Sequence, residues 1–368
     1  LKKMPGVEVD SEGKITVNGK EVKKVMVDGK EFFSDDPKVA SKNLPAKMID
    51  KLQVLDKKSD MAQMTGFDDG EEVINLTVKP GMKQGWFGNA YGGYGSKDRY
   101  EGNAMVNRFV NNDQITFMGG ANNTNNMGFS DLASTMFSGM GGGGGRRGGF
   151  GAGSGITSSG NAGLNFSKEF KPDKLTLGGN TRYSHSDNDA RSKSDRQNIL
   201  PGDSSSYDNS EAMSRTKSDN FGVDFRLEWK PDTMTQLIFR PSFSLSHSMN
   251  DNFSDATTLD NERDTVNTNK SSNYSESNGY NLNASIDFSR KLNNKGRVFS
   301  ATLSGGNSDS YSDGMNRSDI VYFNQTDALK NSIIDQRSRY DNKGFNYRAY
   351  VSWVEPIGHN NFIQATYS

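Results

Sequence analysis

The sequence predicts a membrane all-β fold: an antiparallel transmembrane β-barrel preceded by a small N-terminal α/β domain. Beyond residue 84, runs of about ten to fourteen residues alternate apolar and polar side chains, which is the repeat of a strand with one apolar face. Short turns and long polar connections join these runs in alternation. Strands of about 9–11 residues cross a bilayer, and barrels have short turns at one rim and longer loops at the other.

The composition leaves little material for a water-soluble core. Only 32% of the 368 residues are hydrophobic, yet 10% are aromatic and the net charge is −1. Disordered chains combine low hydrophobicity with high net charge and few aromatics, so disorder is not favoured. The balance of 44 basic and 45 acidic residues gives no general attraction to nucleic acid. The absence of cysteine excludes disulfides and cysteine nucleophiles, and no apolar run is long enough for a membrane helix.

Residues 1–83 predict the small α/β domain. Short strands are expected at residues 7–9, 15–17, 24–27, 53–55 and 73–78. The pairs Asn18-Gly19 and Asp28-Gly29 accept positive φ and predict tight hairpin turns. Helices are expected near residues 36–41 and over residues 45–52, because Pro37 and Pro45 stand where a helix would begin.

Residues 84–368 predict the barrel, and the run from Phe221 to Trp229 shows its two faces. Every second residue there is apolar, and Asp224, Arg226 and Glu228 lie between them. The same division recurs in residues 237–245, 280–288 and 345–353. Closure into a barrel pairs the backbone groups that lipid cannot satisfy. The apolar face is therefore expected to face lipid and the polar face to line the lumen.

Turns and tryptophans support the same interpretation. Short turns are predicted at residues 97–99, 111–113, 171–173, 230–232, 293–296 and 356–359, and long connections over residues 126–160, 187–219, 250–277 and 309–343. About eleven strands follow from residue 85. Trp86, Trp229 and Trp353 all fall at the short-turn rim, as an interfacial aromatic belt requires. A soluble β-sandwich or repeat protein is the alternative, which polar loops of about thirty residues on one side disfavour.

Six segments carry a family resemblance. In order they are residues 1–9 (LKKMPGVEV), 15–20 (ITVNGK), 25–33 (VMVDGKEFF), 43–46 (NLPA), 49–54 (IDKLQV) and 74–79 (INLTVK). This ordered set resembles the plug domain of TonB-dependent outer-membrane transporters, in particular the Bacteroidetes group of outer-membrane β-barrel proteins. The rest of the chain is similar in style, including the glycine-rich residues 139–155 followed by Ile156-Thr157.

The resemblance implies a barrel of about 22 strands with the plug inside. We therefore expect a fragment, with residues 1–83 as plug and residues 84–368 as the first half of the barrel with long extracellular loops. The family is not enzymatic and needs no cofactor. It imports a scarce nutrient (siderophore, glycan, peptide or vitamin) across the bacterial outer membrane by energy-coupled plug displacement. The alternative is a non-transporting barrel that acts as an adhesin or structural protein.

The resemblance also implies the partners. They are outer-membrane lipid, a small nutrient ligand and the TonB complex, which would bind a segment upstream of residue 1. A surface lipoprotein partner is left open, and nucleic acid is not expected.

Candidate site residues come from the polar face and from one glycine-rich segment. The lumen-facing candidates are Asp224, Arg226, Glu228, Arg240, Asp287 and Arg348. They could contact the plug or substrate, or they could pair with one another along a hydrated wall. Arg146 and Arg147 are extracellular loop candidates for an anionic ligand.

Motifs for other chemistry are weak. Gly143, Gly145 and Gly148 have the spacing of a dinucleotide loop, but no strand precedes them and no helix follows. The three histidines lie far apart, and no ordered catalytic triad is present, so no metal or catalytic residue is expected. Asp309, Asp313 and Gly314 match half of a calcium loop, which leaves an irregular calcium site open.

Overall fold

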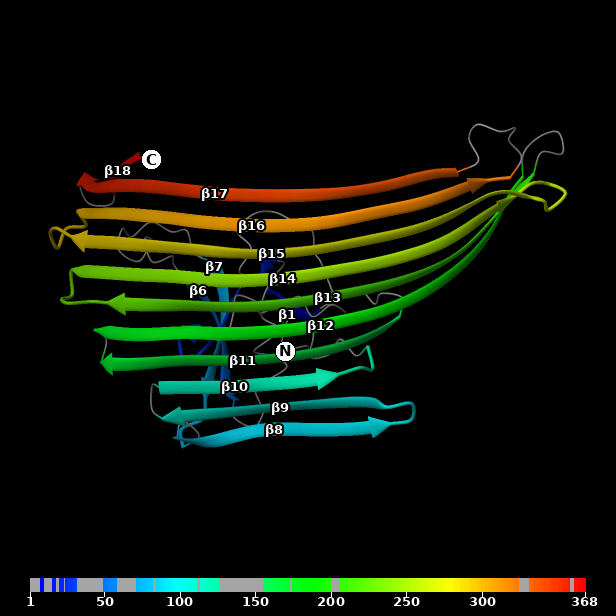
Figure 1. The fold of residues 1–368 in the computed structure, drawn as a ribbon. Helices are drawn as coiled ribbons and strands as arrows, with labels where there is room; N and C mark the ends of the chain where they lie inside the picture. The colour runs from blue at the N-terminus through cyan, green and yellow to red at the C-terminus, as the bar shows by residue number, and fades with distance from the viewer. Residues whose placement is uncertain are drawn as a thin grey trace.

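The computed structural model describes residues 7–9, 15–17, 20–22, 24–31, 49–57, 71–81, 84–110, 113–125, 155–172, 174–199, 205–323, 331–357 and 361–368. All helical or strand structure in these ranges is β-strand. No helix within them has the length and apolar character needed to cross a membrane. The strands form two small sheets near the N-terminus and one sheet of 11 strands (Figure 1).

The first small sheets match most of the predicted N-terminal strands. They contain β1 (Val7–Val9), β2 (Ile15–Val17), β3 (Lys20–Glu21), β4 (Lys24–Val27), β5 (Lys30–Glu31), β6 (Ile49–Lys57) and β7 (Glu71–Val78). Asp28 and Gly29 join β4 to β5 with φ angles of 48° and 79°, which confirms the hairpin turn predicted there. The Asn75 side chain accepts the Gly29 N–H at 2.8 Å and so fixes this turn against β7. Asn18 and Gly19 lie outside the described residues.

The helix predicted over residues 45–52 is wrong where the structure describes it. Ile49 to Leu52 begin β6, which pairs antiparallel with β7. The Lys51 N–H donates to the Thr77 hydroxyl at 3.0 Å next to a register shift in this ladder. Pairing with a buried strand satisfies this backbone and outweighs the local helix signal from Pro45. The helix expected near residues 36–41 lies outside the described residues, so the described part of the N-terminal region is all β.

The large sheet confirms the predicted number of strands. It consists of β8 (Gln84–Gly95), β9 (Arg99–Val110), β10 (Asp113–Asn122), β11 (Ile156–Lys171), β12 (Leu175–Asn198), β13 (Ser206–Trp229), β14 (Thr235–Leu259), β15 (Thr265–Lys291), β16 (Val298–Tyr322), β17 (Asn331–Ile357) and β18 (Asn361–Tyr367). Each strand pairs antiparallel with its sequence neighbours, and β8 and β18 form the two edges.

The short turns that the structure describes lie at or next to the predicted residues, and Pro356 and Ile357, predicted as turn, are the last residues of β17. Lys97 and Asp98 turn with φ angles of 60° and 55° between β8 and β9, a conformation that twisted hairpins favour. Residues 230–234 join β13 to β14, and Asp232 accepts the Met234 N–H at 2.7 Å. Val110 pairs directly with Asp113, which leaves two residues for the turn predicted at 111–113. Sequential antiparallel pairing therefore follows from turn chemistry that the sequence shows.

The long connections are the main difference from the predicted barrel. Most of residues 187–219, 250–277 and 309–343 are paired strand, so β12 to β17 are 24 to 27 residues long. Only residues 199–205, 260–264 and 323–330 separate these hairpin arms. These strand extensions are not evident in the sequence because both faces of the arms are polar. The alternation of apolar and polar residues therefore disappears, although the backbone pairing between strands continues. Most of the connection predicted over residues 126–160 lies outside the described residues.

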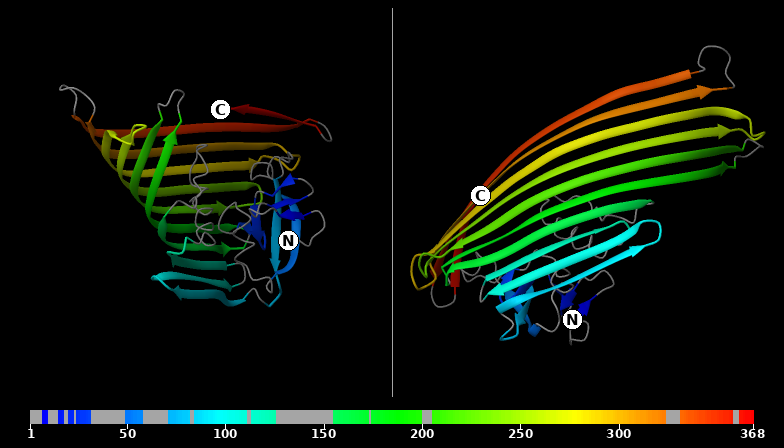
Figure 2. Two further views of the ribbon diagram at one scale, coloured as in Figure 1. Left: turned by 90° about the vertical axis from the view of Figure 1, so that its right-hand side faces the viewer. Right: turned by 60° about the horizontal axis from the view of Figure 1, so that its bottom comes forward.

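The large sheet is curved. Its buried face is rich in polar side chains and its exposed face in apolar ones, which is the reverse of a water-soluble sheet. Figure 2 shows the N-terminal strands on its concave side. Register places the buried side chains of the sheet on one face, including Met105, Thr116, Met118 and Ile238. Many of the buried residues on this face are polar. The large exposed apolar side chains lie mainly on the other, convex face.

Candidate functional site

The convex face carries an apolar band, which Gly305 and Asn307 of β16 interrupt between β15 and β17. We define the convex band as every second residue of 221–229, 237–245, 280–288 and 345–353. Strand register aligns its two ends, because Trp229 pairs with Leu237 and Leu237 with Phe288, while Phe221 pairs with Leu245 and Leu245 with Tyr280. Each segment rises about 27 Å along its strand. Nine residues agree with the about 9–11 residues with which a tilted strand spans the apolar part of an outer membrane.

The band ends abruptly on the side away from the short turns. The next convex positions are His185, Asp219, His247 and Asn278, which follow one another across the strands. The Tyr183 hydroxyl donates to Asp219 at 2.7 Å, and His247 Nδ1 lies 2.7 Å from the Asn278 amide oxygen. A hollow of about 470 Å³ spans this boundary, with Phe221 and Leu245 on one side and Asp219 and His247 on the other. The convex face therefore changes from apolar to polar along one line.

Aromatic residues mark the opposite end of the band. Trp229 and Trp353 lie near the short-turn ends of β13 and β17, and Trp86, near the start of β8, pairs with Arg108 close to the β9–β10 connection. Trp86, Trp229 and Trp353 are 72%, 48% and 40% exposed, respectively. Trp353 packs edge-on against Phe299, with ring centroids 6.4 Å apart. Exposed tryptophans near one rim are typical of a membrane–water interface, where the ring is apolar and the N–H needs a polar partner.

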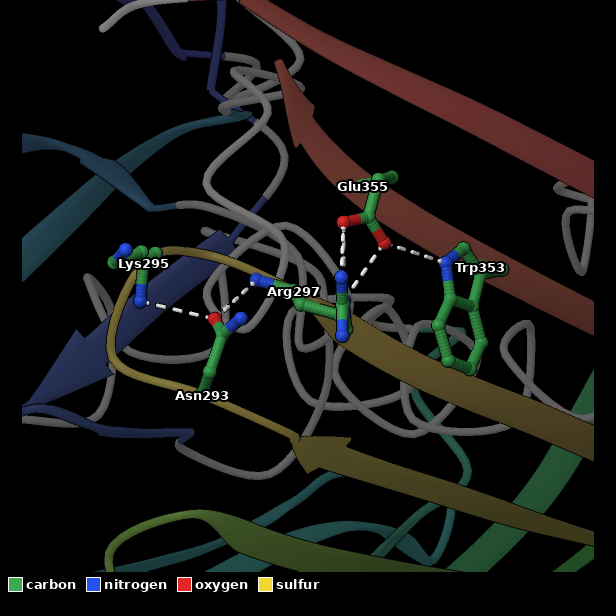
Figure 3. A network of polar contacts seen from close by, with 5 residues as sticks. All are labelled: Asn293, Lys295, Arg297, Trp353 and Glu355. Atoms are coloured by element: carbon green, nitrogen blue, oxygen red, sulfur yellow. Dashed lines mark hydrogen bonds and ion pairs between the residues drawn. The ribbon is translucent and has the colours of Figure 1, made fainter. Parts of the chain in front are cut away.

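A polar network at this rim supplies that partner for Trp353 (Figure 3). The Trp353 indole N–H donates to Glu355 at 3.1 Å, and Arg297 Nε donates to the same carboxylate at 2.7 Å. The turn before Arg297 is held by Asn293, whose side-chain oxygen accepts the backbone N–H groups of Lys295 and Arg297 at 2.9 and 3.0 Å. The β15–β16 turn thus orients Arg297, Arg297 orients Glu355, and Glu355 fixes the indole.

The concave face carries paired charges at the level of the convex band. Arg182 Nη2 lies 2.6 Å from the Asp224 carboxylate, and Arg182 is only 4% exposed. Glu228 accepts from Arg226 at 3.3 Å and from Lys230 at 2.7 Å. Mutual pairing of this kind lets charged side chains line a polar lumen without a free buried charge.

A third pair on the concave face joins neighbouring strands. Arg240 of β14 forms an ion pair with Asp287 of β15, and the Thr302 hydroxyl donates to Asp287 at 2.7 Å. Five of the six lumen-facing candidates therefore contact one another or a neighbouring strand. Arg348 is exposed and takes part in none of the ion pairs among the described residues.

The sequence prediction missed Asn180 and Arg182, which bring β12 into this charged face. Asn180 Nδ2 donates to Asp224 at 2.6 Å. The missing signal has a simple cause, since Gly179 and Thr181 interrupt the apolar alternation of this strand. The polar alternation Asn180, Arg182, Ser184 is the pattern that could have revealed it.

The remaining candidates form no site in the described residues. Arg146, Arg147 and the glycine motif lie outside them. No group of three or more His, Cys, Asp or Glu side chains that could hold a metal ion occurs in the part of the chain that the structure describes. The half calcium loop is an extended strand, because Asp309, Asp313 and Gly314 all belong to β16. Arg337 Nε donates to Asp313 at 3.0 Å, and this hydrogen bonding holds the pKa of Asp313 below its ordinary value.

Comparison with known proteins adds the following. No protein-family model matches the sequence, and no curated protein matches it. Solved structures that resemble it include the open form of the ferric-catecholate import receptor Fiu from E. coli K12, with 12% identity, a TM-score of 0.36, and coverage of 100% of this chain and 66% of that one. The RagAB peptide importer in its open-open state has 9% identity, a TM-score of 0.37, and coverage of 96% and 51%.

The alcaligin outer-membrane receptor FauA from Bordetella pertussis has 13% identity and a TM-score of 0.23, with coverage of 97% of this chain and 56% of that one. The chain thus spans between 51% and 66% of the length of these three structures. At these identities and TM-scores the likeness carries no weight of its own. The functional conclusion rests on the residues and geometry of this chain.

Proposed function

We propose that this chain is part of a TonB-dependent outer-membrane receptor that imports a nutrient. The observation that carries the proposal is the reversed polarity of the large sheet, with an aligned apolar band on its convex face and buried polar and paired charged side chains on its concave face. A water-soluble sheet exposes polar residues and buries apolar ones. Lipid outside and a hydrated lumen inside explain the reversal.

The N-terminal region supports transport rather than a plain barrel. Its ordered motifs resemble a plug domain, and its strands lie on the concave side of the sheet (Figure 2). The paired charges Arg182–Asp224 and Arg240–Asp287 face the same side. Polar contacts across such an interface allow the plug to move, whereas a large apolar interface would hold it in place. Ligand would bind at the outer side, and TonB would displace the plug to open a path.

The proposal is tested in the source organism with the complete gene. A deletion strain is grown on defined iron, glycan and peptide sources, and the source that shows a growth defect is used for uptake of the labelled nutrient. Uptake is compared among the complemented strain, the same strain without TonB, and the same strain treated with a protonophore. The proposal predicts that uptake requires all three: the receptor, TonB and the proton gradient.

The same experiment separates the importer from an adhesin or structural barrel. An adhesin would leave uptake unchanged in the deletion strain and would alter only attachment to surfaces. Uptake that needs the receptor but neither TonB nor the proton gradient would contradict the energy-coupled mechanism while leaving a passive barrel in place.

A further inference from the structure

The outer halves of β12 to β17 carry an uncharged polar surface on their concave face. They extend past the ends of β8 to β11 (Figure 1). We call this surface the neutral wall and define it as the concave-facing residues of the outer half of each strand. The wall begins at Ser184 in β12, Ser246 in β14 and Gly306 in β16 and continues to the end of each strand. In β13, β15 and β17 it runs from the start of the strand to Asn220, Gly279 and Asn346. One complete row across five strands consists of serines, in the order Ser186, Ser218, Ser248, Ser277 and Ser312.

The rest of the neutral wall is also largely uncharged, and on β16 and β17 it includes Ile320, Tyr322, Ile334 and Tyr340. The row beside the serine row contains Asn188, Thr216, Asn250, Ser275 and Gly314. Within the described residues of the wall, the only charged side chains are Arg196 and Asp208, which pair in register at its outer end. The wall therefore offers hydroxyl and amide groups with almost no charge.

The convex face of the same strand segments is highly charged. Its row next to the serine row runs Asp187, Lys217, Met249, Glu276, Asp313 and Arg339. Hydrogen bonding from Arg215 holds the pKa of Asp187 below its ordinary value, so this carboxylate stays ionised well into the acid range. Both faces lie beyond the apolar band, and water alone would accept charge on either. The separation of charged from neutral groups therefore reflects what the concave face contacts.

Neutral hydroxyl and amide groups suit one kind of ligand. Each serine or asparagine side chain both donates and accepts hydrogen bonds, as each sugar hydroxyl does. An anionic chelate would instead require arginine or lysine groups for charge-assisted hydrogen bonds. A charged wall would also leave unpaired charges desolvated against a neutral ligand, which opposes binding.

Hydrogen bonds already present in the wall show that its groups can reach one another and a ligand. Ser277 Oγ donates to Ser312 Oγ at 2.8 Å, and Ser318 Oγ donates to the Asn269 side-chain oxygen at 2.8 Å. The Thr216 hydroxyl donates to the Asn250 side-chain oxygen at 3.1 Å. A hydroxyl or amide oxygen has two acceptor positions, so these contacts leave acceptor capacity along the wall.

Two unpaired side-chain oxygens lie inside the foot of the wall, beyond Arg182. Asn165 of β11 and Asn180 of β12 are register partners on the concave face and are 6% and 8% exposed. The side-chain oxygen of each is buried and accepts no hydrogen bond. An unmet buried acceptor costs about 1–3 kcal/mol.

We propose that the neutral wall binds an uncharged oligosaccharide. The proposal names the substrate class of the receptor, and it rests on the proposed function for the direction of transport. The wall is about 46 Å long along about fifteen residues of strand and about 24 Å wide across six strands. That area fits an extended chain of several sugar units, and Asn165 and Asn180 lie at the inner end of its course.

The test uses the full-length protein purified in detergent. Binding of maltohexaose, cellohexaose and mannohexaose is measured by isothermal titration calorimetry and compared with that of hexagalacturonate, which has the same length and a negative charge on each unit. At least one neutral hexasaccharide is expected to bind at least tenfold more tightly than hexagalacturonate. Equal or tighter binding of hexagalacturonate, or no binding of any neutral hexasaccharide, overturns the proposal.

Matched variants then locate the binding surface. Ser277→Asp places a charge in the centre of the serine row and is expected to weaken the neutral hexasaccharide at least tenfold. Ser277→Thr keeps the hydroxyl and should change binding less than threefold. Ser272→Asp adds the same charge on the exposed convex face of the same strand and should leave binding unchanged. Equal weakening by Ser272→Asp and Ser277→Asp contradicts a site on the concave face.

Failure of this proposal is distinguishable from failure of the proposed function. TonB-dependent uptake of an anionic chelate by the same receptor would support the proposed import function and contradict the proposal that the ligand is a neutral oligosaccharide. Tight binding of a neutral hexasaccharide without TonB-dependent uptake would support the neutral wall as a binding surface and contradict the proposed import function.

Discussion

Replacing Ala284 by arginine places a charge in the middle of the convex band. Ala284 faces outward on β15 between Tyr280 and Phe288, the two ends of the band on that strand. It is four residues from each, which is about 13 Å along the strand. If lipid covers this face, Ala284 lies near the bilayer midplane, so an arginine there is costly.

The magnitude depends on depth. Arginine on the lipid face of a barrel costs about 2–4 kcal/mol at the midplane and about 0–1 kcal/mol near an interface. Ala301 offers the same substitution close to the rim, because it pairs with Phe288 and Val351, one convex row inside Phe299 and Trp353. Ala284→Arg should therefore destabilise the protein by about 2–3 kcal/mol more than Ala301→Arg.

The assay is urea unfolding of the full-length protein refolded into lipid vesicles, followed by tryptophan fluorescence. Asn283→Arg is the matched control, because Asn283 is the neighbouring exposed residue on the concave face. It should change the free energy of unfolding by less than about 1 kcal/mol, since the charge enters a hydrated lumen. Equal costs for Ala284→Arg and Asn283→Arg, or for Ala284→Arg and Ala301→Arg, would refute the lipid-facing band.

Three further predictions concern the rim, the concave face and the outer arms. Glu355→Leu, in a background in which both Trp86 and Trp229 are replaced by phenylalanine, should shift Trp353 emission to longer wavelength, because the indole loses the acceptor that Arg297 orients; an unchanged spectrum would show that Glu355 does not fix the ring. Asp224→Ala removes the carboxylate beside buried Arg182 and should lower the free energy of unfolding by about 2 kcal/mol, whereas Ser242→Ala on the facing strand should be nearly neutral. The lowered pKa of Asp187 means that its ionised carboxylate stabilises the folded state at neutral pH. This stabilisation is lost as the pH falls through the pKa of Asp187 in the folded state. Asp187→Asn should therefore destabilise the protein at pH 7, and its effect on the free energy of unfolding should shrink as the pH falls through the folded pKa; an effect that does not change with pH would contradict this assignment.

Much of the large sheet can be predicted from the sequence, because a strand with one face in lipid alternates apolar and polar residues. The segments around Trp229, Leu245 and Phe288 alternate strictly, and turn residues such as Pro231-Asp232 separate them. Period, turn chemistry and rim tryptophans together predict the eleven strands and their antiparallel order. In each case the signal is local, so a single chain is enough to show it.

Features that depend on pairing are less visible. The outer arms of β12 to β17 are stabilised by backbone ladders between polar strands, and an alternation of serine with aspartate or lysine carries no apolar period. Residues 49–52 likewise form a strand because β7 is available as a partner. Among the site residues, Asp224, Arg240 and Asp287 could be placed on one face, but Arg182 could be placed there only once register was known.

The central claim is that lipid contacts the convex face and water the concave face. Spin labels attached one at a time to cysteines at residues 281–288 of β15, in the full-length protein in vesicles, test it most directly. We predict that power saturation will show higher accessibility to oxygen at the even positions, such as Leu282 and Ile286, and higher accessibility to a water-soluble nickel chelate at the odd positions, such as Asn283 and Asp287. Accessibility without this alternation, or with nickel reaching both faces equally, would contradict the account.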